Sequence, residues 1–359
     1  MMKVVMLCLL SLSGFCWVDA LQQEAIRGSY WKEYLSSGKG NAWFESWNPL
    51  MQTKIDELAQ IAEAREDTTE YFRVMMVGDS TMEHQYGVMC SFLGEREGRR
   101  FDPEVSQNGA PGCCVDTAEG GGGGLCFDYT WFRFFDPKTA ASKRVDAYYF
   151  GSGMHLFHMM PSTPLEPMRI LAWVHYEDLL EATIEGLRKS NPDIRIVFMT
   201  NHIVSDELFT GDFATIRDAY RVGEGNSTIR AECENQVEAV SVSNYVDQKY
   251  YDWRGKPDIE EYIQGDPSEE FSVETYCEEA LLDHHGSLRL VRRAKPVLAR
   301  LGVPIVDGAQ IVDGQAWASK RSDGRHYHPL VPVEIFALLG ALVAPPPPPL
   351  VPLGDAASS

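Results

Sequence analysis

The stretch YFRVMMVGDSTMEHQ, residues 71–85, decides the fold. Its first half contains four consecutive apolar residues, 74–77, which is typical of a β-strand covered on both faces. Gly-Asp-Ser at 78–80 supplies turn and helix-cap residues, and apolar residues then recur at helical spacing over 82–93. The stretch therefore predicts a buried strand, a tight turn and a helix that begins near Ser80.

Short apolar runs and helical patterns alternate along the rest of the chain. The other runs cover residues 126–135, 145–150, 194–199 and 303–306. The other helical patterns cover residues 51–64, 175–189 and one long segment, 273–301. Such alternation implies parallel strands joined by crossover helices. We therefore expect an α/β fold: a three-layer αβα sandwich around a mostly parallel, doubly wound sheet, with the chemistry at the carboxyl ends of the strands.

The composition is that of a globular protein with an acidic surface. The chain has 359 residues, of which 44% are apolar and 11% aromatic. It carries 32 basic and 52 acidic side chains, for a formal net charge of −20. This charge repels nucleic acids and anionic membranes, so we expect neither as a partner.

The first 20 residues resemble a secretory signal. One lysine precedes an apolar run of about 15 residues, which is shorter than the roughly 20 needed to span a bilayer, and Asp19 closes the run. Val-Asp-Ala before Leu21 suits signal peptidase. We expect a cleaved signal, no stable membrane insertion afterwards, and a secreted or luminal protein of the ER or Golgi. An uncleaved anchor is the alternative.

The remaining chain is expected to form one main domain with additions. Residues 21–69 form an aromatic-rich N-terminal segment that packs on the core. Residues 70–343 form the main domain, with a loop-rich insert at about 209–271. Residues 344–359 are a proline-rich tail that we expect to be disordered. The aromatic residues at 30–47 could line a sugar cleft, although packing is the simpler interpretation.

Cysteine usage fits an oxidising compartment. Of eight cysteines, two lie in the signal, which leaves Cys90, Cys113, Cys114, Cys126, Cys233 and Cys277. An even number in this context indicates disulfides, although the pairing cannot be read from the sequence. Because adjacent cysteines rarely bond to each other, Cys113 and Cys114 should have different partners. No C-x-x-C or H-x-x-x-H spacing supports a metal site, and Asn226-Ser-Thr is a glycosylation acceptor.

Ser80 is the candidate nucleophile. At a strand-to-helix turn its hydroxyl would stand at the carboxyl edge of the sheet, where helix amides stabilise developing negative charge. A serine also needs a base and a group that orients the base. Asp323 and His326, three residues apart around Gly324, can provide both. The simpler alternatives are a helix-cap serine and a surface loop.

These motifs together resemble the SGNH (GDSL-type) hydrolases, and within them the PC-esterase and trichome-birefringence-like branch. The resemblance covers about residues 71–343 and rests on VGDSTMEHQ, on FRFFD after Cys126 and on SDGRHYHP. It implies a flavodoxin-like three-layer sandwich and acyl transfer through a serine ester. It also implies an oxyanion hole formed by the amides of Ser80 and Gly153 and by Asn201. The usual Gly-x-Asn-Asp block is absent. Gly151 is the fallback donor, and ordinary turn residues are the alternative.

The expected function is that of a serine-dependent acyl esterase or O-acyltransferase. The resemblance and the secretory context favour O-acetyl groups of a polysaccharide or glycan as the substrate. A non-catalytic glycan-binding or cell-wall protein with the same fold is one alternative, and a lipid esterase is another. No cofactor is expected, since the five glycines at 120–124 lack the Lys-Ser/Thr of a phosphate-binding loop.

The other histidines are expected to be structural. His328 competes with His326 as the base but lacks the three-residue spacing to Asp323. Histidines in loops more often form hydrogen bonds within the fold than bind ligands. We expect such structural roles for His155, His158, His202 and His328. The neighbours His284 and His285 point to different faces of a helix, which makes a metal pair improbable.

Overall fold

The computed structural model describes residues 40–64, 71–96, 113–116, 124–131, 145–151, 153–157, 167–221, 230–235, 237, 273–319 and 323–345. Several sequence-based expectations lie outside the described residues. These are the signal at 1–20, the acceptor Asn226, most of the insert, and the tail beyond residue 345.

The described strands form one six-stranded sheet in the order β2-β3-β1-β4-β5-β6. They are β1 (Phe72–Gly78), β2 (Cys113–Asp116), β3 (Gly124–Trp131), β4 (Ala147–Gly151), β5 (Arg195–Met199) and β6 (Ile305–Val306). Every neighbouring pair is parallel except β2 with β3, which is antiparallel. The expected α/β fold with a mostly parallel sheet is confirmed.

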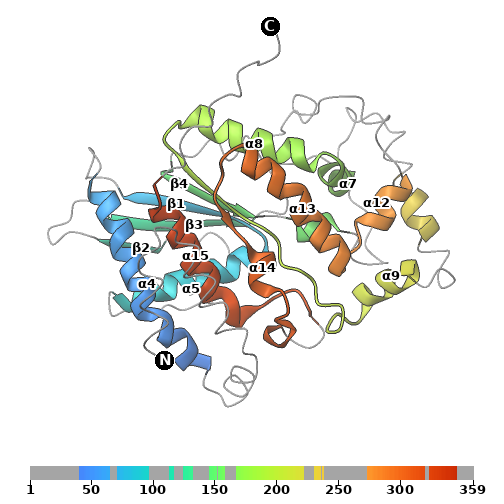
Figure 1. Ribbon diagram of the computed structural model, residues 1–359, viewed down its shortest axis with the longest axis horizontal. Helices are drawn as coiled ribbons and strands as arrows, with labels where there is room; N and C mark the ends of the chain where they lie inside the picture. Colours follow the sequence, from blue (N-terminus) through green and yellow to red (C-terminus); the bar gives the residue numbers. More distant parts are fainter. Residues whose placement is uncertain are drawn as a thin grey trace, which may run out of the picture.

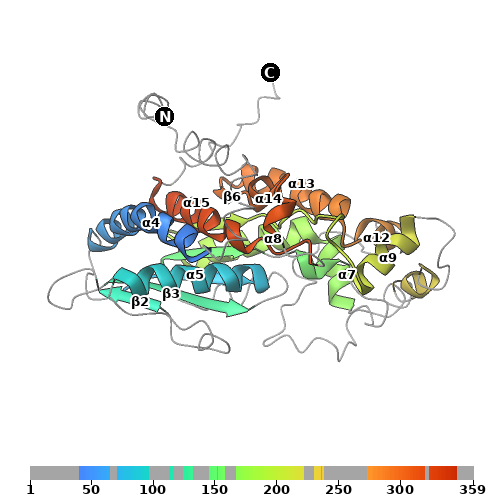
Figure 2. The same cartoon turned by 90° about the horizontal axis from the view of Figure 1, so that it is seen from below.

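Helices cover both faces of the sheet (Figure 1). The first face carries α4 (Gly40–Glu63), α5 (Ser80–Arg96) and α15 (Val331–Val343). The second carries α7 (Pro167–Val174), α8 (Tyr176–Ser190), α12 (Val273–Glu279) and α13 (His284–Arg300). The other helices are α9 (Asp212–Arg221) and α14 (Gly308–Val312). Figure 2 shows α9 and α12 at the opposite end of the molecule from α4.

Alternation along the central strands separates two hydrophobic cores. In β1, Phe72, Val74 and Met76 join the core under α4, α5 and α15. Met75 faces the core under α8 and α13. Because successive strand residues point to opposite faces, a run that is apolar at every position supplies both cores at once. The continuous apolar run of β1 therefore follows from its central place in the sheet.

Four elements differ from the sequence-based expectation. Strand β2 was missed because it has only four residues, and Val115 is its one buried side chain. The expected helix over 273–301 is two helices, since Asp283 caps α13 by accepting a hydrogen bond from the backbone N of Gly286 at 2.7 Å. The expected helix over 51–64 begins earlier, at Gly40. The loop-rich insert begins with a helix, α9.

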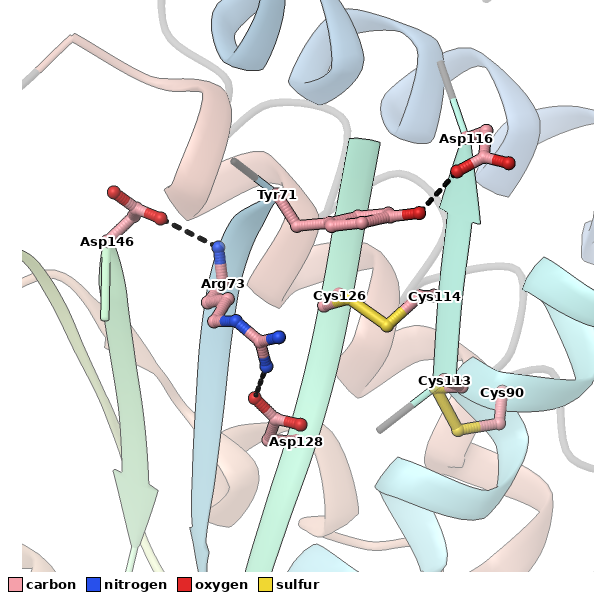
Figure 3. Close-up of a disulfide and its surroundings, with 9 residues drawn as sticks. All are labelled: Tyr71, Arg73, Cys90, Cys113, Cys114, Asp116, Cys126, Asp128 and Asp146. Atoms are coloured by element: carbon pink, nitrogen blue, oxygen red, sulfur yellow. Dashed lines mark hydrogen bonds and ion pairs between the residues drawn. A yellow bond between two sulfur atoms is a disulfide. The ribbon is translucent and has the colours of Figure 1, made fainter. Parts of the chain in front are cut away.

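Three disulfides connect the six cysteines, and Cys113 and Cys114 have different partners, as expected. The pairs are Cys90–Cys113, Cys114–Cys126 and Cys233–Cys277. The first two fasten the short edge strand β2 to α5 on one side and to β3 on the other (Figure 3). In the same region, Tyr71 donates to Asp116, and Arg73 binds Asp128 at 2.9 Å. Two disulfides thus reinforce an edge strand that buries only Val115 and, among the described strands, pairs with β3 alone.

Among the described residues, no helix has both the length and the apolar character needed to cross a membrane.

Glycine at the end of β1 allows a close approach to β4, which gives a stability prediction. A Cβ on Gly78 would lie 2.6 Å from the carbonyl oxygen of Gly151 in β4. We expect Gly78→Ala to lower the free energy of unfolding by about 1–3 kcal/mol, the usual cost of overpacking. Chemical denaturation followed by circular dichroism measures the change.

Gly87 provides the matched control. It lies inside α5, and a Cβ there would have no neighbour within 4 Å. Gly87→Ala should raise the free energy of unfolding by about 0.5–1 kcal/mol, because alanine loses less backbone entropy in a helix. Equal stability of the two variants would contradict the assigned packing.

Candidate active site

Ser80 lies at the turn where β1 ends and α5 begins. The Asp79 carboxylate caps the helix by accepting from the backbone N of Thr81 at 3.0 Å. From β3, the Tyr129 hydroxyl reaches the carbonyl oxygens of Gly78 and Asp79, each at 3.2 Å. Helix cap and cross-strand contact together fix the turn, and they place the Ser80 hydroxyl at the carboxyl edge of the sheet.

A continuous chain of hydrogen bonds joins Ser80, His326 and Asp323. Ser80 Oγ lies 2.7 Å from His326 Nε2, and His326 Nδ1 lies 2.9 Å from Asp323 Oδ2. Because a carboxylate accepts, Nδ1 carries the proton and Nε2 can accept the proton of the serine hydroxyl. The structure therefore brings the three sequence-predicted residues together in the order that nucleophilic catalysis requires.

The loop that carries His326 needs glycine at its corner. Gly324 has φ +64°, and a Cβ there would lie 2.7 Å from the carbonyl oxygen of Ser205. The backbone N of Ser205 donates to the Gly324 carbonyl at 2.7 Å. Tyr327 also donates, through its hydroxyl, to the carbonyl of Ile203 at 2.8 Å. The loop that carries His326 is thus docked on the segment that follows β5.

Asp323 is held in its ionised form. Burial raises the pKa of this carboxyl, but the hydrogen bond and charge of His326 and the Arg325 guanidinium lower it by more, so the net pKa lies below the usual range. Arg325 Nε is 3.1 Å from Asp323 Oδ1, and the backbone N of His326 is 3.2 Å from Oδ2. The Arg325 side chain and the His326 N–H thus donate hydrogen bonds to the Asp323 carboxylate and orient it toward the imidazole.

His84 is a site residue that the sequence analysis missed. Its ring is 5.4 Å from that of His326 and 4.1 Å from that of His328, between centroids. Burial and the neighbouring imidazoles lower the pKa of His84 to about 3, so it is neutral beside the base. The spacing contained a signal, since His84 is four residues after Ser80 and so shares its helix face. His328 packs on His84, whereas it is His326 that bonds to Ser80.

The expected oxyanion residues Gly153 and Asn201 differ in their surroundings and hydrogen bonds. Gly153 has φ +156°, and its hypothetical Cβ would lie 2.2 Å from Leu290 Cδ2 and 3.6 Å from Asn201 Oδ1. Asn201 donates both side-chain hydrogens, to the carbonyls of His202 at 3.0 Å and Ser287 at 3.1 Å. With those two bonds kept, Asn201 has no third hydrogen for an oxyanion. The oxyanion roles of Ser80, Gly153 and Asn201 stay predictions.

The remaining histidines have structural contacts. His155 packs edge-on against Trp131, with 5.8 Å between ring centroids. His284 and His285 begin α13 and contact each other, rather than lying inside one long helix as expected. No group of three or more His, Cys, Asp or Glu side chains in the described part of the chain could hold a metal ion. His158 lies outside the described residues.

The geometry predicts an activated serine. A fluorophosphonate, which phosphonylates nucleophilic serines, should label the protein at Ser80, and Ser80→Ala should abolish the label, as read by mass spectrometry. Ser91→Ala is the control, because Ser91 lies in the same helix with its hydroxyl bonded to the Gly87 carbonyl at 3.2 Å. Labelling that survives in Ser80→Ala would contradict the assignment.

Comparison with solved structures shows a similarity of the backbone. A solved structure, that of a "putative SGNH hydrolase from Slackia heliotrinireducens", has a TM-score of 0.34 and 12% sequence identity to this chain. The match covers 76% of this chain and 97% of that chain. No protein-family model matches, and no curated protein is similar.

Proposed function

We propose that this protein is a serine-dependent acyl esterase or O-acyltransferase that acts on O-acetyl groups of a polysaccharide or glycan. The observation that carries the proposal is the hydrogen-bonded chain from Ser80 Oγ through His326 to Asp323. The α/β arrangement and the resemblance to SGNH hydrolases in residues 71–343 support the same reaction class. The PC-esterase branch and the glycan substrate rest on the resemblance.

The chemistry follows from the positions of the three side chains. Ser80 Oγ attacks the ester carbonyl while His326 Nε2 takes the hydroxyl proton, and Asp323 stabilises the resulting imidazolium. The sugar oxygen then leaves with that proton, and the acyl group remains on Ser80. His326 next deprotonates the second nucleophile, which is water in an esterase or a sugar hydroxyl in a transferase. Attack of this nucleophile returns the free serine.

The negative charge of the tetrahedral intermediate develops beside the first turn of α5. First-turn amides of a helix have no acceptor within the helix, and they carry the positive end of its dipole. The Asp79 side chain uses the Thr81 amide. We assign the Ser80 amide to the oxyanion, with Gly153 as the second donor on the opposite loop. Loss of one such donor typically costs about 3–4 kcal/mol of barrier height.

An exposed aromatic ring supports a carbohydrate substrate. Trp131 is 44% exposed, and it is the large hydrophobic residue that stands out among the described residues. It ends β3 in register with Gly78 of β1, two residues before Ser80. The indole presents an apolar face with a polar N–H, a combination that suits the apolar face and hydroxyl rim of a sugar ring. The charge of −20 argues against nucleic acid as the partner.

The compartment fits the same proposal. Three disulfides are typical of proteins in oxidising environments, where glycans and polysaccharides are also found. Together with the signal-like residues 1–20, they support a secreted or luminal enzyme without stable membrane insertion.

A glycan-binding protein without turnover is the second candidate. The observation that favours it is the engagement of both Asn201 side-chain hydrogens by backbone carbonyls, which removes one expected oxyanion donor. Such a protein would bind glycans but release no acyl group.

Acetate release distinguishes the candidates. The mature protein incubated with acetylated xylan or acetylated glycoprotein glycans should release acetate, or transfer it to an added acceptor sugar, as followed by enzymatic acetate assay and mass spectrometry. Ser80→Ala should do neither, because no acyl-enzyme forms. Glycan binding without release or transfer by the wild-type protein would instead favour the binding protein.

Trp131 should separate glycan binding from the chemical step. We expect Trp131→Ala to raise KM for an acetylated oligosaccharide about tenfold, which corresponds to about 1.4 kcal/mol, because the sugar loses its stacking surface. Hydrolysis of p-nitrophenyl acetate should not change, since that ester needs no sugar subsite. Trp131→Phe keeps a ring and serves as the control. Equal losses on both substrates would exclude a sugar platform.

A further inference from the structure

A second imidazole–carboxylate pair lies beneath the catalytic loop. His202 follows β5, and Glu334 belongs to α15. His202 Nε2 lies 2.6 Å from Glu334 Oε1, and the two side chains are 2% and 0% exposed. A charged pair is costly to remove from water, and apolar residues of similar size are often as stable or more stable in its place. Its presence here therefore points to a role beyond packing.

The pair connects the sheet to the loop that carries the base. Tyr149 in β4 donates to Gln85 Oε1 at 2.8 Å, and Gln85 Nε2 donates to Glu334 Oε2 at 2.6 Å. At the other end, His202 Nδ1 lies 3.0 Å from the carbonyl oxygen of Arg325. Arg325 immediately precedes His326. The network thus runs from the central sheet, through α5 and α15, to the backbone beside the catalytic imidazole.

The direction of every bond in this network is determined. A carbonyl only accepts, so His202 Nδ1 carries a hydrogen and donates it to Arg325. Burial lowers the pKa of His202, but the Glu334 carboxylate raises it by more, so the net pKa is raised. Burial also raises the pKa of Tyr149, which keeps its hydroxyl as a donor. Each group therefore has one role, and none can be removed without leaving a buried polar atom unpaired.

We propose that His202 and Glu334 are positioning residues that hold the catalytic loop so that His326 Nε2 meets Ser80 Oγ. They touch no reacting atom and act through the Arg325 carbonyl. Two other contacts hold the loop at different points. The Ser205 N–H donates to the Gly324 carbonyl, and the Tyr327 hydroxyl donates to the Ile203 carbonyl. His202 holds the carbonyl of the peptide between Arg325 and His326 from outside the loop, whereas Asp323 holds the N–H of that peptide from within the loop. The expected effect on kcat rests on the proposed acyl-transfer function.

Two substitutions at His202 separate its two bonds. The amide of glutamine reaches the place of Nε2, so His202→Gln keeps a donor to Glu334 and loses the donor to Arg325. The amide of asparagine takes the place of Nδ1, so His202→Asn keeps the donor to the Arg325 carbonyl and leaves Glu334 Oε1 without a donor, while Gln85 still donates to Oε2. His202→Gln therefore loses only the hydrogen bond to the loop, and His202→Asn loses only the hydrogen bond to Glu334 in the core.

The expected result is a crossed pattern of stability and rate. His202→Gln should lower kcat for acetyl ester hydrolysis about 100-fold, as for a catalytic group displaced by about 1 Å, with little change in KM and a small change in Tm. His202→Asn should lower Tm more, because it leaves a buried carboxylate oxygen unpaired, but retain more kcat than His202→Gln. Glu334→Gln, whose amide can donate to neutral His202 and accept from Gln85, should also retain more kcat than His202→Gln. If kcat follows Tm across the three variants, the role is structural and the proposal is wrong.

Hydrogen exchange tests the same positioning without catalysis. The backbone N of His326 donates to Asp323 Oδ2 at 3.2 Å, so its exchange rate reports on the loop. Exchange should accelerate in His202→Gln and change less in His202→Asn. Equal exchange in wild type and His202→Gln would overturn the proposal. A wild-type protein that neither hydrolyses esters nor reacts with a fluorophosphonate would refute the proposed function instead, and the exchange experiment would still decide the positioning role.

Discussion

The pairing of β1 with a parallel strand on each side is the constraint on which the rest of the structure depends. Gly78 lies in register with Trp131 of β3 and with Gly151 of β4, and a side chain at Gly78 would meet the Gly151 carbonyl. Because neighbouring parallel strands end at one edge, the loops after β1, β4 and β5 open on the same side of the sheet. The two hydrophobic cores pack on the two faces of this sheet. The candidate active site lies at the edge where β1, β4 and β5 end.

The base arrives at this edge from the far end of the chain. Its loop is docked on the segment after β5 through Ser205 and Gly324, and its corner has a conformation that favours glycine. Beneath it, Glu334 and His202 form a fully buried carboxylate–imidazole pair that resembles the half-buried pair of Asp323 and His326. The outer pair is partly exposed and bonds to Ser80, as the proposed proton transfer requires, whereas the inner pair is buried and holds a backbone carbonyl.

Covalent bonds also support α5, the helix that begins at Ser80. Cys90 ties α5 to the edge strand β2, and Cys114 ties the same strand to β3 (Figure 3). A four-residue strand with a single buried side chain gains little from packing, so the disulfides supply what burial does not. The helix that begins at Ser80 is therefore fastened both at its first turn, by Asp79 and Tyr129, and near its last turns, by Cys90.

The sequence by itself determined the strand–turn–helix at Ser80, the parallel α/β sheet and the Asp323–His326 spacing, because these depend on local periodicity and on turn residues a few positions apart. It did not reveal β2, the break before α13, or the engagement of Asn201. These depend on disulfides, on the Asp283 helix cap, and on the Ser287 carbonyl, which lies 86 residues from Asn201 in the chain. His84 and Glu334 did leave traces, as a histidine one turn after the serine and a lone charge in an apolar helix. Only the tertiary structure decided what they contact, because hydrogen-bond partners separated by more than a hundred residues are chosen by how the elements pack and not by local sequence.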